Sequence, residues 1–220
     1  EVLALMMQNE HLEKRFGVGF HTISVPRLRP AEGVNLKTFP HLLDDEMFKK
    51  IVTIIRIAVP YTGMILSTRE SAEMREILLK YGISQVSAGS CTGVGGYEEH
   101  IQGKQVNQFQ LADERSPRQV IEDLMEAGYI PSYCTSCYRT GRVGEKFMEI
   151  AKTEKIHNMC KPNALTTLLE YAVDYGDQEL LQRVEGFVRE QAAEIENIHI
   201  QNFVLKNIDK LKAGERDLYL

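Results

Sequence analysis

The sequence predicts an α/β fold with a parallel sheet, followed by a mainly helical region. In the first half of the chain, short apolar runs alternate with segments of helical periodicity, which is typical of βαβ units. After Ser116 the strand pattern stops, and amphipathic helical patterns follow one another. Three or four βα units are visible, and they fit either part of a (β/α)8 barrel or a small open sheet.

The first half contains all the predicted strands. In chain order, we expect a helix over residues 2–16, a strand over 20–26, a helix over 44–60, a strand over 63–68, a helix over 70–82, and strands over 83–89 and 105–112. Gly17 and Gly82 end two of these helices, because glycine readily adopts the left-handed conformation of a helix C-terminus. The chain begins inside a helical pattern and without Met, so we expect it to be part of a longer protein.

The second half is predicted to be helical. Its first helix covers residues 116–128, with Ser116 as the N-cap and Pro117 at the first position. Further helices are expected over 144–155, 163–176, 177–195 and 200–215. The change in pattern predicts two domains, residues 1–114 and residues 115–220.

Composition and charge exclude several classes of protein. With 43% hydrophobic and 26% charged residues, the chain has the composition of a soluble globular protein. Its net charge of −5 argues against a nucleic-acid partner, and no apolar run is long enough for a membrane span. It shows no signal peptide, and four cysteines do not make a secreted disulfide scaffold. We therefore expect a cytoplasmic protein with reduced thiols.

Three cysteines form the most informative pattern, Cys134-x2-Cys137-x22-Cys160. A redox dithiol needs only the first two. A structural zinc site needs four ligands, and His157 supplies a fourth next to Cys160. An iron–sulfur cluster also accepts three thiolates, which leaves one iron open to another ligand. Inert burial is the remaining interpretation, and the spacing alone leaves these alternatives open.

Polar residues at the ends of predicted strands form a second group of candidates. Ser67, Thr68 and Arg69 directly follow a strand, where hydroxyl and guanidinium groups suit a carboxylate or phosphate ligand. Alternatively, one of the two hydroxyls caps the next helix. Arg27 follows the strand that starts near His21, so in a barrel these two residues would lie at opposite ends. A core histidine and a surface ion pair are the structural alternatives for His21 and Arg27.

Four segments together resemble a known family over essentially the whole chain. "HTISVPRLRPAEG", "YTGMILSTRES", "SAGSCTGVGGYEE" and "CTSCYRTGRVGEKFM" resemble the C-terminal half of the HydG family, the radical S-adenosylmethionine (SAM) tyrosine lyases of [FeFe]-hydrogenase maturation. "VPRLRP" and "STRE" are shared with the sister thiamine-pathway lyase ThiH, whereas the cysteine pattern is specific to the HydG family. The resemblance implies the C-terminal part of a (β/α)8 TIM-type radical SAM barrel plus a helical C-terminal extension.

The resemblance also implies an activity. A radical derived from SAM cleaves L-tyrosine to p-cresol and dehydroglycine, which is converted to CO and cyanide. These products are assembled into an Fe(CO)(CN) unit on an auxiliary [4Fe–4S] cluster that carries an additional labile iron. Other hydrogenase maturation proteins are the implied partners.

Site residues follow from the same resemblance. Cys134, Cys137 and Cys160 match the ligands of the auxiliary cluster. His21 matches the ligand of the labile iron, with His11 as a weaker competitor. Arg27, Ser67, Thr68 and Arg69 are implied to bind the carboxylates of SAM or of tyrosine, and their division between these two ligands stays open.

The sequence departs from the family in one respect, because it contains no Cys-x3-Cys-x2-Cys motif. The second [4Fe–4S] cluster and the SAM site are therefore expected in a missing N-terminal half of the barrel, and this chain alone is expected to be inactive. Two alternatives are a 2-iminoacetate synthase of thiamine biosynthesis, and a non-enzymatic interaction module that binds zinc through Cys134, Cys137, His157 and Cys160.

Overall fold

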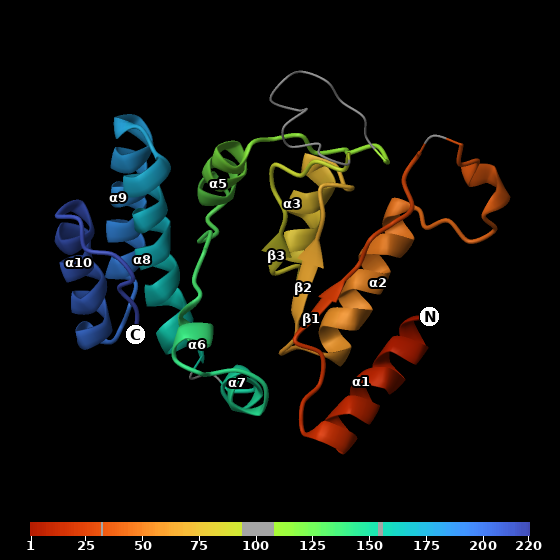
Figure 1. The fold of residues 1–220 in the computed structure, drawn as a ribbon, viewed down its shortest axis with the longest axis horizontal. Coiled ribbons are helices and arrows are strands. Elements are labelled where there is room, and N and C mark those ends of the chain that lie inside the picture. The colour runs from red at the N-terminus through yellow and green to blue at the C-terminus, as the bar shows by residue number, and fades with distance from the viewer. Residues whose placement is uncertain (32, 94–107, 154–155) are drawn as a thin grey trace. The chain divides into compact units, whose positions relative to one another are not determined.

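The computed structural model describes residues 1–31, 33–93, 108–153 and 156–220. The chain divides into two compact units, Glu1–Val120 and Ile121–Leu220, and each is described by itself (Figure 1). Across the described residues, no helix combines the length and the apolar character that crossing a membrane would require.

The first unit is built on a small parallel sheet. Its strands are β1 (Thr22–Ser24), β2 (Gly63–Leu66) and β3 (Gln85–Val86), in the order β1-β2-β3. Ile23 pairs with Met64 and Leu66 pairs with Val86, both in parallel. The parallel sheet predicted from the alternating pattern is confirmed, although the strands are shorter than predicted. Because the strands are parallel, their carboxyl ends lie at one edge of the sheet, which we call the carboxyl edge.

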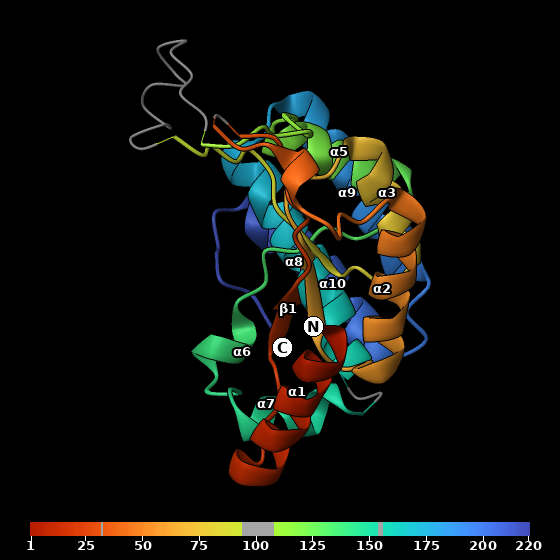
Figure 2. The same ribbon diagram turned by 90° about the vertical axis from the view of Figure 1, so that its right-hand side faces the viewer.

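Helices cover one face of this sheet. They are α1 (Val2–Phe16), α2 (Asp45–Ala58) and α3 (Ala72–Lys80), whereas the 3-10 helix η1 (Leu36–Thr38) lies in the loop between β1 and α2 and has no buried residue. Figure 2 shows α2 and α3 on the same side of the strands. Phe48 and Val52 of α2 and Leu78 of α3 pack in one core with Ile23 and Met64 of the sheet. The apolar stripe of each helix therefore meets the apolar face of the sheet.

The connection after α3 shows why a glycine is needed there. Gly82 has φ 111°, and the Ile83 amide donates to the Leu78 carbonyl at 3.1 Å, which closes the helix as predicted. A Cβ at Gly82 would lie 2.5 Å from the Arg56 side chain. Arg56 in turn donates to the Gly82 carbonyl at 2.7 and 2.9 Å, so this close approach fixes the turn before β3.

One predicted strand has no counterpart in the part of the segment that is described. Residues 105–107 of the 105–112 segment lie outside the described residues, and residues 108–112 contain no strand. These residues pair with loops instead, since the Gln110 amide donates to the Pro30 carbonyl at 2.9 Å and the Ala112 amide to the Thr68 carbonyl at 3.0 Å. The glycine-rich residues 90–99 are described only as far as Gly93.

The second unit is helical, as predicted. The described helices are α5 (Pro117–Glu126), α6 (Ser136–Arg139), α7 (Glu145–Ala151), α8 (His157–Tyr175), α9 (Gln178–Ala193) and α10 (Ile198–Lys212). The boundary between the two units lies inside α5. Ser116 caps α5, and its own amide donates to Gln119 Oε1 at 2.9 Å, which makes a reciprocal capping box. Buried side chains of α5, α8, α9 and α10 share one core, including Leu165, Val188 and Ile208.

Helix α8 begins earlier than the sequence pattern predicts. The predicted start is residue 163. The helix instead starts at His157 and contains Pro162. Pro162 is the sixth residue of α8, past the four amides that lack an intrahelical partner, so the helix tolerates the loss of one intrahelical hydrogen bond near its N-terminus. As a result, Cys160 lies in the first turn of α8 rather than in a loop.

Beyond α10 the chain packs back against α8. Arg216 pairs with Asp174 at 2.5 Å, and the Asp217 amide donates to Glu170 Oε2 at 3.2 Å. At the end of this segment, the Leu220 amide donates to Asn163 Oδ1 at 2.8 Å. The last residues are therefore fixed to the helix that carries Cys160.

Candidate functional site

Glu70 is the centre of a charged network at the carboxyl edge. Its carboxylate is 1% exposed and accepts from Arg27 Nε at 3.0 Å and from Arg29 Nη2 at 3.1 Å, and it also pairs with Arg27 Nη2. Arg27 donates to Asp45 at 2.7 Å and lies 4.5 Å above the Phe48 ring. The hydrogen bond with Glu70 raises the pKa of Arg27, burial opposes this, and Asp45 reinforces it.

This network bears on the role predicted for Arg27. Most of its donors are used by Glu70, Asp45 and the Leu43 carbonyl, so Arg27 acts first as a scaffold for the loop after β1. Its predicted binding of a ligand carboxylate stays a prediction. Sequence reasoning missed Glu70, which looked like an ordinary residue of a first helical turn. The sequence signal that could have predicted this network is the pair Arg27 and Arg29 after one strand and the acid Glu70 after the next strand.

Ser67 and Thr68 do not cap the helix that follows. The N-cap of α3 is Ser71, whose hydroxyl accepts from the Met74 amide at 3.2 Å, so the capping alternative is wrong. Ser67 Oγ accepts from the Arg69 amide at 3.4 Å, and the buried Thr68 holds the 108–113 segment through its carbonyl. Ser67 and Thr68 therefore stabilise the turn after β2 and its contact with residues 112–113, and neither hydroxyl caps α3.

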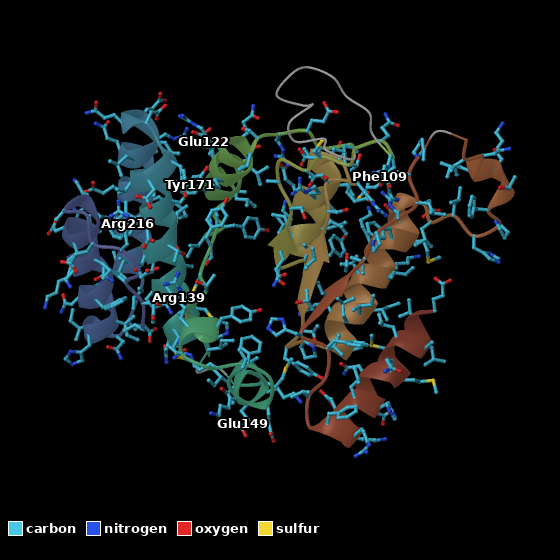
Figure 3. All side chains as sticks on the ribbon, viewed as in Figure 1. Phe109, Glu122, Arg139, Glu149, Tyr171 and Arg216 are labelled. Carbon is cyan, nitrogen blue, oxygen red and sulfur yellow. The ribbon has the colours of Figure 1, made fainter. Side chains whose placement is uncertain are left out.

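Arg69 differs from the other arginines of the carboxyl edge. Its guanidinium lies 4.2 Å above the ring of Phe109, which Figure 3 labels near the ends of the strands. Within the described residues, its side chain makes no ion pair and no hydrogen bond. A stacked guanidinium that keeps its hydrogen-bond donors suits a carboxylate ligand. Arg69 is therefore the strongest candidate at this edge.

A second buried ion pair lies beneath the carboxyl edge, and sequence reasoning missed it as well. Arg75 of α3 pairs with Asp113, which also accepts from Arg115 Nη2 at 2.6 Å. Burial raises the pKa of Asp113, but the hydrogen bonds from Arg115 and the charges of Arg75 and Arg115 outweigh it, so the pKa is lowered overall. Burial lowers the pKa of Arg75, and Asp113 partly offsets this.

His21 lies at the opposite end of the strands from these residues. It directly precedes β1, and its exposed ring has Nδ1 at 3.1 Å from Thr22 Oγ1. Its carbonyl accepts from the Gly63 amide at the start of β2. The competing His11 is an exposed residue of α1. The position predicted for His21 at a strand start is confirmed, while its role as an iron ligand stays a prediction.

The three cysteines of the predicted cluster site belong to the second unit, and we call them the thiol site (Cys134, Cys137 and Cys160). Cys134 directly precedes α6, Cys137 lies in α6, and Cys160 lies in the first turn of α8. All three are free thiols. Although Cys160 is an exposed residue, desolvation of its thiol raises its pKa, the charges of Cys137 and then Cys134 raise it further, and Arg142 lowers it. The three thiols are thus close enough to interact electrostatically.

A tight turn and one buried hydroxyl hold the thiol site. The Arg142 amide donates to the Cys137 carbonyl at 2.8 Å, and Gly141, with φ 69°, allows the chain to turn there. Ser136 is 2% exposed, and its Oγ lies 3.2 Å from Cys134 Sγ. Arg142 donates to the Leu220 carbonyl at 3.0 Å, but its buried Nε has no acceptor among the residues that the structure describes.

These features are compatible with an iron–sulfur cluster. In the described ranges, which include all three cysteines and His157, no three His, Cys, Asp or Glu side chains are grouped closely enough to hold one ion. Ligands of one zinc all lie about 2.3 Å from it, whereas each thiolate of a cluster binds its own iron, so those sulfurs lie farther apart. An unpaired Arg142 donor beside Cys160 also suits a negatively charged thiolate cluster.

Comparisons with known proteins agree with this arrangement. The family model described as "Biotin and Thiamin Synthesis associated domain" matches residues 24–130. The 2-iminoacetate synthase of Escherichia coli strain K12 is 31% identical over 127 residues, which is 58% of this chain and 31% of the synthase. The crystal structure of HydG, a maturase of the [FeFe]-hydrogenase, is 48% identical with a TM-score of 0.94 and covers 100% of this chain. This chain is a relative of HydG and of 2-iminoacetate synthase.

A second solved structure supports the relationship to HydG. HydG from Carboxydothermus hydrogenoformans is 34% identical with a TM-score of 0.71 over 94% of this chain. The chain spans 47% and 44% of these two HydG chains, so it is about half their length. The predicted fold class, the C-terminal part of a radical SAM (β/α)8 barrel with a helical extension, is confirmed by the match to HydG.

Proposed function

We propose that this HydG relative is the C-terminal part of a radical SAM tyrosine lyase of [FeFe]-hydrogenase maturation. In this proposal, the whole enzyme cleaves L-tyrosine to p-cresol and dehydroglycine, makes CO and cyanide, and assembles an Fe(CO)(CN) unit. The proposed location is the cytoplasm, where thiols stay reduced. Tyrosine, an N-terminal barrel half with its own [4Fe–4S] cluster and SAM, and the other maturation proteins are the proposed partners.

The observation that carries the proposal is the thiol site in a chain that matches HydG from end to end. The family model ends at residue 130, before Cys134. The synthase from Escherichia coli matches 58% of this chain, whereas the HydG crystal structure covers 100% of it. The segment with the three interacting thiols is therefore accounted for by the relationship to HydG.

Each candidate residue has a chemical role in this proposal. Cys134, Cys137 and Cys160 would hold three irons of an auxiliary [4Fe–4S] cluster, and His21 would hold the additional labile iron through a neutral imidazole. When bound, the auxiliary cluster would supply the iron chemistry of the site. Arg69 would bind a carboxylate of tyrosine or SAM through the donors that it keeps, and Glu70 would hold Arg27 at the same edge.

A second candidate function is 2-iminoacetate synthesis, because that is the name of the curated relatives. Both functions share the cleavage of tyrosine in this proposal, so tyrosine turnover cannot separate them. The thiol site does separate them, since a synthase has no use for it.

The test uses a protein with the full length of its relatives, supplied with SAM, tyrosine and reductant. Cys160→Ala should leave p-cresol formation within about twofold but abolish the infrared bands of iron-bound CO and cyanide. Cys91→Ala is the matched control and should keep both. If Cys160→Ala retains the infrared bands, the maturation proposal is wrong; if the unmodified protein makes 2-iminoacetate without CO, the synthase is the better assignment.

A further inference from the structure

A chain of hydrogen bonds runs from a main-chain amide to the sulfur of Cys134. The Leu220 amide donates to Asn163 Oδ1 at 2.8 Å, and Asn163 Nδ2 donates to Ser136 Oγ at 3.1 Å. Ser136 Oγ in turn lies 3.2 Å from Cys134 Sγ. Asn163 and Ser136 are 1% and 2% exposed, so water does not compete for these bonds. The Cys134 sulfur is thus joined to the C-terminal segment through two buried side chains.

From this arrangement, we propose that Ser136 and Asn163 are positioning residues that aim a hydroxyl proton at the Cys134 thiolate and thereby raise the reduction potential of the bound cluster. The proposal rests on the proposed function, because it needs a cluster at the thiol site. It goes further by assigning a role to two residues that are not ligands.

The Leu220 amide fixes the orientation of Asn163. An asparagine amide can be placed in two ways, with its oxygen and nitrogen exchanged. The Leu220 N–H is a donor, so the atom that faces it must be the acceptor Oδ1. The Nδ2 group is then directed at Ser136, and it also lies 3.5 Å from the Leu220 carbonyl. The two polar ends of Asn163 therefore each have a defined partner.

This orientation determines what Ser136 can do. A hydroxyl has one proton and two lone pairs. Asn163 occupies one lone pair of Ser136 Oγ, which leaves the proton free to point at Cys134. While Cys134 is a thiol, its S–H donates to Ser136; when Cys134 is a thiolate ligand, the direction reverses and the hydroxyl donates to sulfur. Only the second direction stabilises negative charge on the sulfur.

Donation to a ligand sulfur favours the reduced cluster. Reduction adds an electron, and hydrogen bonds to the sulfurs are among the features that set the potential of an iron–sulfur centre. The donor is buried, where an electrostatic bond is stronger than in water. Loss of the Ser136 hydroxyl should therefore lower the reduction potential without removing any ligand.

A matched control exists on the same cysteine. Ser132 Oγ accepts from the Cys134 amide at 3.2 Å, so Ser132 holds the backbone of Cys134 but does not touch its sulfur. A purely structural effect on Cys134 should appear in Ser132→Ala as much as in Ser136→Ala. An electrostatic effect on the sulfur should appear only when the Ser136 hydroxyl is lost or misdirected.

The experiment is redox titration of the whole chain after anaerobic reconstitution with iron and sulfide, followed by EPR of the reduced cluster. Ser136→Ala should keep the iron content and lower the potential, shifting the redox equilibrium about threefold to tenfold, where tenfold is about 59 mV for one electron. Ser136→Thr should restore the potential, and Ser132→Ala should leave it unchanged. Asn163→Ala, which keeps the hydroxyl but frees its orientation, should lower the potential by a smaller amount.

The outcomes separate this inference from the proposed function. If the unsubstituted chain binds no cluster, the proposed function fails and this inference fails with it. If the cluster forms and neither Ser136→Ala nor Asn163→Ala changes its potential, only the inference is overturned. If Ser136→Ala binds no iron, the Asn163→Ala variant alone tests the inference. A lowered reduction potential of its cluster would support the inference, and an unchanged potential would overturn it.

Discussion

The clusters of polar side chains in the two units differ in whether the protein itself supplies their partners. In the first unit, opposite charges are paired within the protein, Asp113 with Arg75 and Glu70 with Arg27. In the second unit, Cys160 lies close enough to Cys137 and Cys134 for their charges to raise its pKa. The ion pairs of the first unit neutralise each other and need no further partner. Three thiolates would be stabilised by bound cations, which is the role proposed for the iron of a cluster at the thiol site.

The largest effect on folding is expected at Asp113. Its side chain and that of Arg75 are 1% and 3% exposed, so Asp113→Asn would leave a buried guanidinium without a counter-charge. The expected cost is about 3–5 kcal/mol in the free energy of unfolding at pH 7. Urea denaturation measures it. A cost below about 1 kcal/mol, typical of a surface ion pair, would contradict a buried structural role for the pair of Asp113 and Arg75.

The same substitution predicts a pH dependence. The pKa of Asp113 is lowered in the folded chain, so its stabilising contribution is present above the unfolded pKa of about 3.9 and is lost as pH falls through the folded value. The difference between the unsubstituted chain and Asp113→Asn should therefore shrink between about pH 5 and pH 2. Urea midpoints across this range measure it, and a constant difference would assign the effect to packing alone.

A smaller effect is expected at Glu70. The side chains of Arg27 and Arg29 are 11% and 26% exposed, so both recover some hydration when the carboxylate is lost. Glu70→Gln should cost about 2–3 kcal/mol, below the range for fully buried pairs. Glu46→Gln is the control, because the surface ion pair between Glu46 and Lys49 is screened by water and should contribute little to stability. Equal costs at Glu70 and Glu46 would show that the buried ion pairs of Glu70 contribute no more to stability than an exposed one.

The smallest effect on stability is expected at Arg69. Stacking on Phe109 is its only contact of this kind in the described part of the chain, and such a contact contributes about 0.5–1 kcal/mol at an exposed site. Arg69→Gln should therefore cost under about 1 kcal/mol, whereas Arg27→Gln should cost more than twice that amount. Thermal denaturation of both variants measures the difference. If Arg69→Gln is as costly as Arg27→Gln, Arg69 is structural and loses its support as a binding residue.

Sequence periodicity predicted the order of helices and strands well, because it depends on local apolar spacing. The caps at Gly82 and Ser116 were also predicted correctly, since each depends on a few neighbouring residues. The predicted start of α8 at residue 163 was wrong, because the helix continues through Pro162 and begins at His157. The strand predicted over 105–112 is absent from the described residues 108–112. There the backbone amides of Gln110 and Ala112 donate to loop carbonyls and not to a neighbouring strand.

The contacts between distant residues could not be predicted from sequence. Glu70 and Arg27 are far apart in the chain, as are Arg75 and Asp113, and charge alone does not reveal such pairs. The bond between Asn163 and Leu220 is likewise invisible in the sequence. The cysteine pattern was informative because metal chemistry limits its spacing, so the thiol site was found where ordinary polar contacts were not.

The most direct test of the account is anaerobic reconstitution of this chain with iron and sulfide. We predict about four to five irons per chain and the EPR signal of a reduced [4Fe–4S] cluster. The cluster should be lost in Cys160→Ala and kept in Cys91→Ala, the matched control in the first unit. A colourless chain that takes up one zinc, or an iron content that is the same with and without Cys160, would contradict the assignment of the thiol site.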